Sequence, residues 1–505
     1  MATNFVSRRK FIGTASIGAV GAMGLLLAAC GGGGGGAAPA AAPTSAPGIG
    51  GAAAPAGGAA AAKPTTGPAS GAAPAGAQQK AGSAVNWLVR TTPAENDGQE
   101  KVFEPAIKAK YPDLKVNRIV VPGKEYIPKI NTMAAAKESL EIWGFGGNYF
   151  DYWARKLSEP LNQYITADKW DVDAYFQEGL MDIFKVHGKY NGLSQLTTFG
   201  QVIGYNKNLL DAAGLKPPTV DWNDASWTFD ALLEMAKKLT KNYGKPDAVY
   251  GVLLDVDSMV DMAWFEGTDN FLPEHYKDGI AQKTNFNNEG NIAGLQLRHD
   301  WIYKEKVMPD PSMDQGLNQL GNPFQSGKIA LNMTGGWQFW NTSPIKEFKY
   351  GFAADPRLKT NKHHNYDDFW IMGRFSSNKE NAWKVMRVLT DEKVASDYSV
   401  LSGTPPTPRK SLDAWIQNLA QRTGQSVEDL KKLLEGAIDP KISQESQDHL
   451  FLQHPKIHDT FDNEIQPLWG SADTSAAKLV PQVAKKLDEI VLGIYNQFKD
   501  SLPAD

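Results

Sequence analysis

The stretch "AVNWLVR" (84–90) is the first of three apolar segments that decide the fold. It reads as a short buried strand. The following helix is predicted from the capping signature Thr92–Glu95 and from apolar residues that recur at helical spacing up to Ile107. A second strand is expected over 113–121, a second helix over 126–136, and a third strand in "LEIWGFGG" (140–147). This β-α-β-α-β order predicts an α/β fold with a parallel sheet covered on both faces.

The rest of the chain continues the alternation of apolar strands and amphipathic helices. Strands are expected over 198–206, 248–256, 326–337 and 348–356, and helices over 207–214, 227–244, 381–389 and 478–498. The part of the chain from Ala84 onward has roughly 420 residues, which is too long for one ordinary hydrophobic core. We therefore expect two lobes.

The only cysteine of the 505 residues, Cys30, follows an export-type segment. Arg8 and Arg9 stand in "SRRKFI", which resembles the twin-arginine export motif, and an apolar run extends to residue 29. "LAAC" resembles a lipobox, so residues 1–29 are interpreted as a signal peptide and Cys30 as an acylated membrane anchor. The alternative is a single membrane-spanning helix, which the glycines of the run disfavour.

Residues 30–83 are built almost entirely of Gly, Ala, Pro, Ser and Thr. Such a segment has too little apolar surface to offset its chain entropy, so we expect a disordered linker between the anchor and the folded body. The net charge of −4 and the lack of a basic stripe argue against nucleic acid as a partner. The 14 tryptophans exceed what packing alone requires, which favours an aromatic binding site.

Four segments carry a resemblance to a known family. They are "EIWGFGGNYFDYWARKLSEPLNQYI" (141–165), "IGYNKNLLDAAGLKPPTVDWNDASWTFDALLEMAKKLT" (203–240), "FQSGKIALNMTGGW" (324–337) and "GTPPTPRKS" (403–411). With them the chain resembles the extracytoplasmic solute-binding proteins of ABC importers, in the large carbohydrate-binding class that includes the maltodextrin-binding protein family.

The resemblance implies a two-lobed periplasmic-binding-protein-like fold of type II, with a multi-crossover hinge and a ligand cleft between the lobes. Lobe one would hold residues 85–197 and 370–400, and lobe two residues 198–369 and 401–500. It also implies a monomer, tethered by lipid to the outer face of the cell membrane, that delivers its solute to two permease subunits with cytoplasmic ATPases.

Sugars present polar rims and apolar C–H faces, so their sites combine flat aromatic rings with hydrogen-bonding groups. The resemblance places Trp143 and Trp337 as cleft tryptophans, with burial in the core as the alternative for Trp143. Further candidates follow strands or lie near the crossings, and for each a packing, hinge or surface role stays open: Asn148, Tyr149, Thr198, Asp257, Trp264 and Trp370.

The acidic residues of the chain leave other functions open. The same fold could bind a polyamine or another cationic or phosphorylated solute, an alternative that Asp255, Asp257 and Asp261 leave open. A glycoside hydrolase needs two carboxylates across the scissile bond, but the adjacent Asp367 and Asp368 would point to opposite sides of a strand. We therefore expect a binding protein with no enzymatic activity, no metal and no cofactor.

Overall fold

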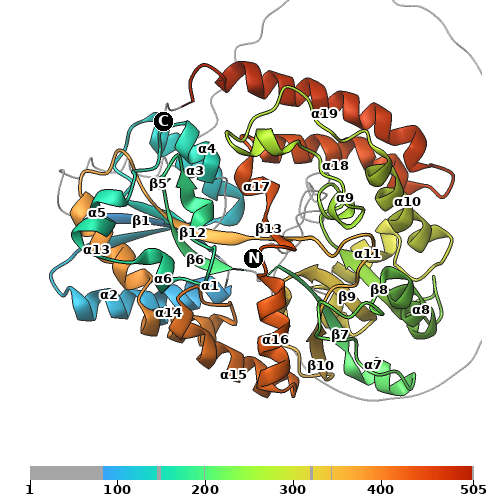
Figure 1. Cartoon of the computed structure of the whole chain (residues 1–505). Coiled ribbons are helices and arrows are strands. Elements are labelled where there is room, and N and C mark those ends of the chain that lie inside the picture. The colour runs from blue at the N-terminus through green and yellow to red at the C-terminus, as the bar shows by residue number, and fades with distance from the viewer. Residues whose placement is uncertain are drawn as a thin grey trace, which may run out of the picture. The chain divides into compact units, whose positions relative to one another are not determined.

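The structure is a computed structural model of the chain, and it describes residues 84–91, 93–144, 149–197, 200–318, 322–342 and 344–502 (Figure 1). The predictions for the export signal with Arg8 and Arg9, for Cys30, for the linker, for Asn148 and for Thr198 lie outside these residues. Among the helices that are described, none combines the length and the apolar character that a membrane crossing requires.

The first sheet has five strands in the order β2-β1-β3-β12-β6. β1 (Val85–Thr91) pairs in parallel with β2 (Val116–Pro122) and with β3 (Ile142–Gly144), as the β-α-β-α-β pattern predicts. β12 (Asp367–Met372) runs antiparallel to β3 and to β6 (Leu193–Thr197), so the complete sheet is mixed. A strand from much later in the sequence thus lies between β3 and β6.

Helices pack around this sheet, and one predicted helix is interrupted. α1 (Pro93–Gly98) runs through a π-helical turn η2 (Gln99–Phe103) into α2 (Glu104–Lys110). Phe103 stacks on Tyr398 with ring centroids 4.5 Å apart. The other elements here are α3 (Gly123–Ala135), α4 (Tyr149–Ala154), α5 (Asn162–Ala167), α6 (Val172–Tyr175), η3 (Asp182–Phe184), β4 (Lys185–Val186), β5 (Lys189–Tyr190), α13 (Lys379–Leu389) and α14 (Glu392–Ser402).

The second sheet has the order β10-β7-β9-β8. Its strands are β7 (Gln201–Asn206), β8 (Tyr250–Asp255), β9 (Ile329–Gly335) and β10 (Tyr350–Ala353), and β8 and β9 are parallel. Around it lie α7 (Lys207–Ala212), α8 (Phe229–Leu239), α9 (Asp261–Phe265), η4 (Pro273–Tyr276), α10 (Glu289–Tyr303), α11 (Pro311–Asn318), η5 (Pro323–Ser326) and α12 (Gln338–Asn341).

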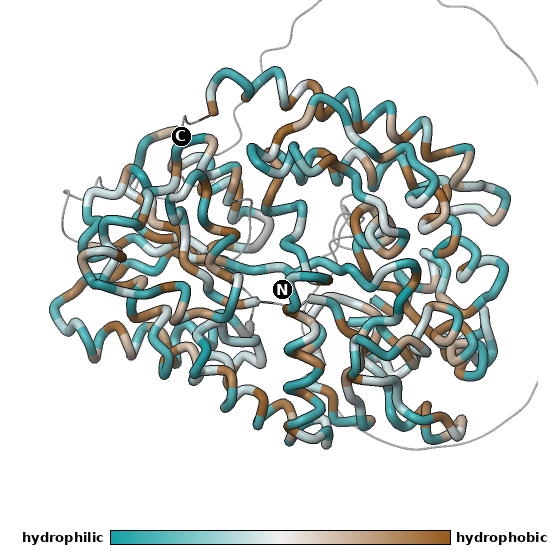
Figure 2. Tube along the Cα trace, viewed as in Figure 1, coloured by the Kyte–Doolittle hydropathy of each residue, from teal (hydrophilic) through white to brown (hydrophobic). Residues whose placement is uncertain are grey.

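The C-terminal helices complete the second group. α18 (His454–Gly470) packs on α19 (Ala476–Phe498), whose apolar stripe Val480, Val483, Leu487 and Ile494 is buried as its helical spacing predicts. Hydrophobic and hydrophilic stretches alternate along the tube of α19 in Figure 2. α10 also contacts α19, so the long terminal helix covers elements that flank the second sheet.

Crossing segments connect the two sheets. β11 (His363–Asn365) pairs in parallel with β13 (Ser443–Glu445) and leads directly into β12. η6 (Arg409–Ser411), α15 (Leu412–Thr423) and α16 (Val427–Ala437) precede β13, and α17 (Gln447–Leu450) follows it. β12 pairs with the first sheet from Asp367 onward. The exact bounds of the two lobes stay a prediction.

Candidate functional site

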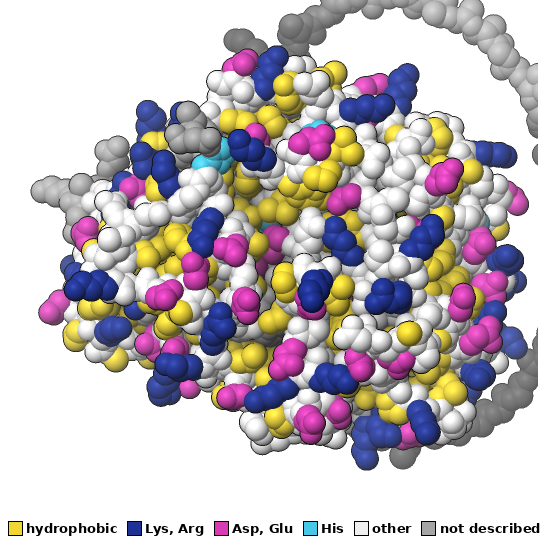
Figure 3. Space-filling model, viewed as in Figure 1, with side chains coloured by type: hydrophobic (Ala, Val, Ile, Leu, Met, Phe, Trp, Pro, Cys, Tyr) yellow, Lys and Arg dark blue, Asp and Glu magenta, His cyan; other side chains and the backbone are white. Residues whose placement is uncertain are grey.

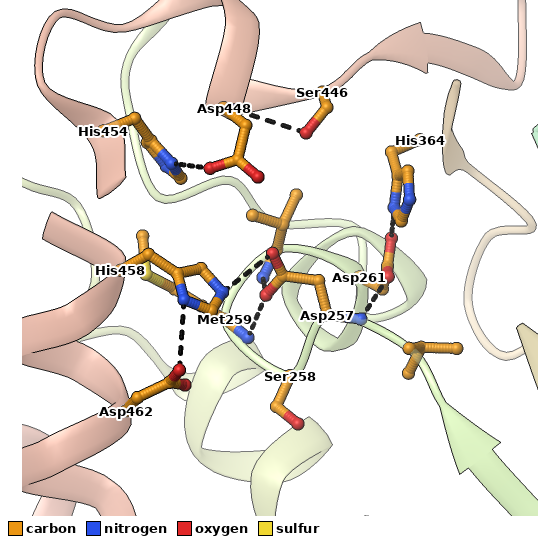
Figure 4. Close-up of polar contacts among 12 residues, drawn as sticks. Asp257, Ser258, Met259, Asp261, His364, Ser446, Asp448, His454, His458 and Asp462 are labelled. Atoms are coloured by element: carbon orange, nitrogen blue, oxygen red, sulfur yellow. Dashed lines mark hydrogen bonds and ion pairs between the residues drawn. The ribbon is translucent and has the colours of Figure 1, made fainter. Parts of the chain in front are cut away.

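Where β8 ends, a set of ionisable side chains lies beneath the surface. We call it the histidine–carboxylate cluster, and its members are Asp257, Asp261, His364, Asp448, His454, His458 and Asp462 (Figure 4). They come from the β8–α9 connection, the first residue of α9, β11, α17 and α18. The carboxyl end of a strand in an open α/β sheet is where such folds bind ligands.

Asp257 is held from several sides. Its Oδ1 accepts hydrogen bonds from the amides of Met259 (2.8 Å) and Val260 (3.1 Å), while its Oδ2 lies 3.1 Å from Nε2 of His458. Burial opposes ionisation of this carboxyl, but the facing His458 outweighs it and keeps the pKa of Asp257 below its usual value. Asp257 is therefore a carboxylate whose charge is already compensated.

Asp261 and His364 form the second pair. Asp261 is fully buried; its Oδ2 accepts the amide of Asp257 at 2.7 Å, and its Oδ1 lies 2.8 Å from Nδ1 of His364. Burial lowers the pKa of His364, but Asp261 more than offsets this and raises it to about 9. Nε2 of Gln201 also lies 3.2 Å from Nδ1 of His364. The His364 ring is therefore a charged group with a fixed orientation.

Histidine–carboxylate contacts also occur on α17 and α18. Nδ1 of His454 lies 2.6 Å from Oδ1 of Asp448, and Nδ1 of His458 lies 3.3 Å from Oδ2 of Asp462. Burial disfavours the charged His458, yet the pKa of His458 is raised because Asp257 and Asp462 face it. The pKa of Asp448 is lowered, since its contact with His454 outweighs its burial. Each carboxyl group of the cluster thus has a histidine of the cluster as its neighbour.

Several buried polar side chains in and next to the second sheet have no hydrogen-bond partner among the described residues. Both carboxyl oxygens of Asp355 and both amide atoms of Asn332 and Gln338 are of this kind. Burial, and then the neighbouring Asp261, raise the pKa of Asp355 well above its usual value. A buried polar atom without a partner costs about 1–3 kcal/mol, so a polar ligand that satisfies such atoms gains binding energy.

A second group of this kind lies around β12 and β13. Oδ2 of Asp367, Oε2 of Glu445 and the hydroxyl of Tyr149 have no partner within the described part of the chain. Burial and the nearby Glu445 raise the pKa of Asp367. The ring of Tyr149 packs against Phe369 and His449, with centroids 5.6 and 5.7 Å away. Tyr149 on α4 therefore contacts both β12, through Phe369, and α17, through His449.

Three of the predicted site residues lie in or beside these groups. Asp257 is part of the cluster. Trp337 is half-buried, and its ring lies nearly parallel to that of His364 with centroids 6.0 Å apart. A methyl group at Gly335 would overlap the Trp337 ring, so a residue without Cβ is needed there. Tyr149 joins the second group.

The structure places three predicted tryptophans inside packed cores. Trp143 is 2 % exposed and meets Tyr152 edge-on at 5.5 Å, and Trp370 is fully buried against Trp87 at 5.9 Å. Trp264 is also buried, and its Nε1 donates to Asp269 at 2.9 Å. None of the three presents an open ring face in this structure, and a role in ligand binding stays a prediction for them.

Sequence reasoning missed the histidines of the cluster. Their signal was present: His454 and His458 stand four residues apart, which places both on one face of α18. His363 and His364 follow each other in the chain. On β11 they have different neighbours, since His363 contacts the carbonyl of Ala437 at 3.0 Å. No group of potential metal ligands occurs within the residues that the structure describes.

Comparisons with known proteins agree with this architecture. The family model "Bacterial extracellular solute-binding protein" matches residues 92–396, more than half of the chain. A binding protein of Brucella abortus is 26% identical over 366 residues, which are 67% of this chain and 81% of that protein. The galactooligosaccharide-binding protein of Bacillus subtilis is 24% identical over 56% of this chain and 63% of its own length.

A solved structure shares the fold. An ABC substrate-binding protein of Listeria monocytogenes in complex with cycloalternan superposes with a TM-score of 0.65 at 21% identity, covering 80% of this chain and 98% of that one. This confirms the predicted α/β periplasmic-binding-protein fold, and the family match confirms a binding protein rather than an enzyme. By that match the chain belongs to the bacterial extracellular solute-binding proteins.

Proposed function

We propose that this protein is the substrate-binding component of an ABC importer and that its solute is a carbohydrate. The observation that carries the proposal is the half-buried Trp337 ring beside a cluster whose charges are internally paired. An indole face covers the apolar side of a sugar ring, and Asp257 with Asp355 would bond its hydroxyls.

The charges of the cluster favour a neutral solute over a cationic one. A polyamine needs carboxylates free to pair with it, but Asp257 is engaged by His458 and Asp261 by His364. Burial, and then Asp261, raise the pKa of Asp355, which weakens its attraction for a cation. What remains for a ligand is a set of neutral donors and acceptors, which matches the hydroxyls of a sugar.

The relatives point the same way. The Bacillus subtilis protein is named for galactooligosaccharides and the Listeria structure holds cycloalternan. The exposed face in Figure 3 mixes Lys and Arg with Asp and Glu side chains and has no large area of one sign, consistent with a partner that is not a nucleic acid.

Export and anchoring are further parts of the proposal. The family is extracellular, and the lipobox-like segment before Cys30 supports acylation at that cysteine after export through a signal with Arg8 and Arg9. The linker of residues 30–83 would let a monomeric body reach two permease subunits at the outer face of the membrane.

A titration of intrinsic tryptophan fluorescence tests the proposed function. The exported protein is titrated with neutral mono- and oligosaccharides and, in parallel, with spermidine. We expect saturable binding of at least one saccharide at about micromolar Kd, and no response to spermidine. A response to spermidine together with none to any saccharide would replace the carbohydrate with a cationic solute.

A further inference from the structure

His364 on β11 lies between the buried carboxylate of Asp261 and the ring of Trp337. Its Nδ1 is 2.8 Å from Oδ1 of Asp261 (Figure 4). Its ring stacks on the indole of Trp337, with ring centroids 6.0 Å apart and planes inclined by 27°. Aromatic rings prefer such offset, nearly parallel arrangements at centroid distances of about 4.5–7 Å. His364 therefore joins the histidine–carboxylate cluster to the tryptophan of the candidate solute site.

The register of β11 decides which of its two histidines contacts Trp337. β11 is held by its pairing with β13, in which His364 lies opposite Gln444. Successive side chains of a strand point to opposite faces, and the ring of His363 packs against Trp222 with centroids 4.7 Å apart. The two neighbouring histidines thus have separate surroundings, and the strand fixes the position of the ring that contacts Trp337.

The charge of His364 strengthens its contact with the indole. Burial lowers the pKa of His364, but the carboxylates that face it, Asp261 foremost, raise it to about 9. The ring is therefore a cation at neutral pH. A cation near the face of an indole is attracted by the negative charge of the π system, out to about 6 Å from the ring centroid. Loss of the proton would weaken the contact with Trp337.

The groups that face His364 from the surrounding elements are mainly carboxyls. They are Gln201 on β7, Asp257 before α9, Asp261 on α9, Asp355 after β10, Glu445 on β13 and Asp448 on α17, with His363 beside it on β11. Burial lowers the pKa of His363, so this neighbour adds little opposing charge near neutral pH. The surroundings of His364 therefore favour its protonated form up to about pH 9.

Trp337 lies in a short connection, where a neighbouring side chain can set its orientation. β9 ends at Gly335 and α12 begins at Gln338. The indole passes so close to Gly335 that a methyl group there would overlap it, and it is half-buried. It therefore rests against the Gly335 backbone and the His364 ring while part of it stays exposed. A side chain held in one orientation loses little conformational freedom when a solute covers it.

We propose that His364 is a positioning residue of the solute site, whose ring holds the Trp337 indole in the orientation that a solute covers. The inference rests on the proposed function for the identity of the solute, but the contact between the two rings exists without any solute. His364 acts through Trp337, so the affinity for the solute depends on the protonation of this histidine.

The fluorescence of Trp337 tests the contact in the absence of solute. It is obtained as the difference between the protein and its Trp337→Phe variant, which cancels the emission of the other tryptophans. A protonated imidazole quenches a neighbouring excited indole more strongly than a neutral one, because it is the better electron acceptor. We expect the emission of Trp337 to rise between about pH 7 and about pH 10, with a midpoint at about pH 9.

Two variants assign this titration to His364. His364→Gln keeps a hydrogen-bond donor for the Asp261 carboxylate but removes the ring and the charge, so the Trp337 emission should not titrate in this range. Asp261→Asn should move the midpoint at least about one pH unit lower. His275→Gln, on η4, is the matched control and should titrate like the wild type. Because the two variants are independent, either one decides the test should the other fail to fold.

The same proton should control the affinity for saccharides. Those that the titration with mono- and oligosaccharides finds to bind should bind about three- to tenfold more weakly at about pH 10 than at about pH 7.5. His364→Gln should bind them at about pH 7.5 as weakly as the wild type does at about pH 10, with little further dependence on pH.

The outcomes separate this inference from the proposed function. A Trp337 emission that stays constant over this pH range, or a midpoint that neither variant moves, would overturn the positioning role of His364. Equal affinity of His364→Gln and the wild type would overturn it as well. If no saccharide binds although the emission titrates as expected, the proposed function fails and the control of the Trp337 ring by His364 stands.

Discussion

Replacing Asp261 with asparagine would leave a buried cation without its partner. Asp261 is fully buried and lies 2.8 Å from His364, whose pKa is raised to about 9. Removing one member of a buried ion pair costs about 3–5 kcal/mol, because the other charge stays in the protein interior. We expect Asp261→Asn to lose about this much free energy of unfolding at about pH 6.

The dependence of that loss on pH identifies its cause. The pKa of His364 is raised above its value of 6.5 in the unfolded chain, so its stabilising contribution is full below about pH 6.5 and is lost as pH rises through about 9. The difference of 2.5 pKa units corresponds to about 3 kcal/mol. The destabilisation by Asp261→Asn should therefore shrink markedly between about pH 6 and about pH 9.5.

Urea unfolding followed by tryptophan fluorescence at both pH values measures this. Asp397→Asn is the matched control, because Asp397 pairs with Lys393 on an exposed helix face, where such pairs contribute less than about 1 kcal/mol. If Asp261→Asn lost the same stability at both pH values, this would refute the inference that His364 is charged and paired with Asp261.

Three further predictions concern single positions. Trp337→Ala should weaken saccharide binding at least about tenfold in a fluorescence titration, whereas Trp337→Phe should cost less; an unchanged affinity would remove Trp337 from the site. Gly335→Ala should weaken binding in the same assay, because the new methyl group displaces the Trp337 ring; wild-type affinity would contradict this. Burial raises the pKa of Asp255 from 3.8 to about 7, so folding stability should fall as pH rises from about 4 to about 7, and Asp255→Asn should flatten this slope in urea unfolding; an unchanged slope would contradict it.

The regular elements could be predicted because their signals are local. Alternating and helical apolar spacing located β1, α8 and α19, and glycines and prolines marked their ends. The π-helical turn inside 93–110 was not predicted, since the stacking of Phe103 on Tyr398 joins residues almost 300 positions apart. β12 could not be assigned to the first sheet from the spacing of apolar residues, because its partners β3 and β6 are distant in the sequence.

The site was only partly predictable. Asp257 follows a strand, so its position at a sheet edge could be inferred from the chain order. Trp337 was placed by the resemblance to the family, and the strand predicted over 326–337 ends earlier, at Gly335. Trp143 and Trp370 lie within strands, and a strand has two faces that sequence spacing cannot assign to core or cleft. The pairing of Asp257 with His458 depends on the docking of α18, which no local pattern encodes.

A crystal structure of the protein with the saccharide identified by titration is the most direct test of the central claim. We predict that a sugar ring lies in contact with the face of Trp337, with hydroxyls bonded to Asp257 or Asp355. A saccharide bound elsewhere, with the Trp337 ring untouched, would contradict the account.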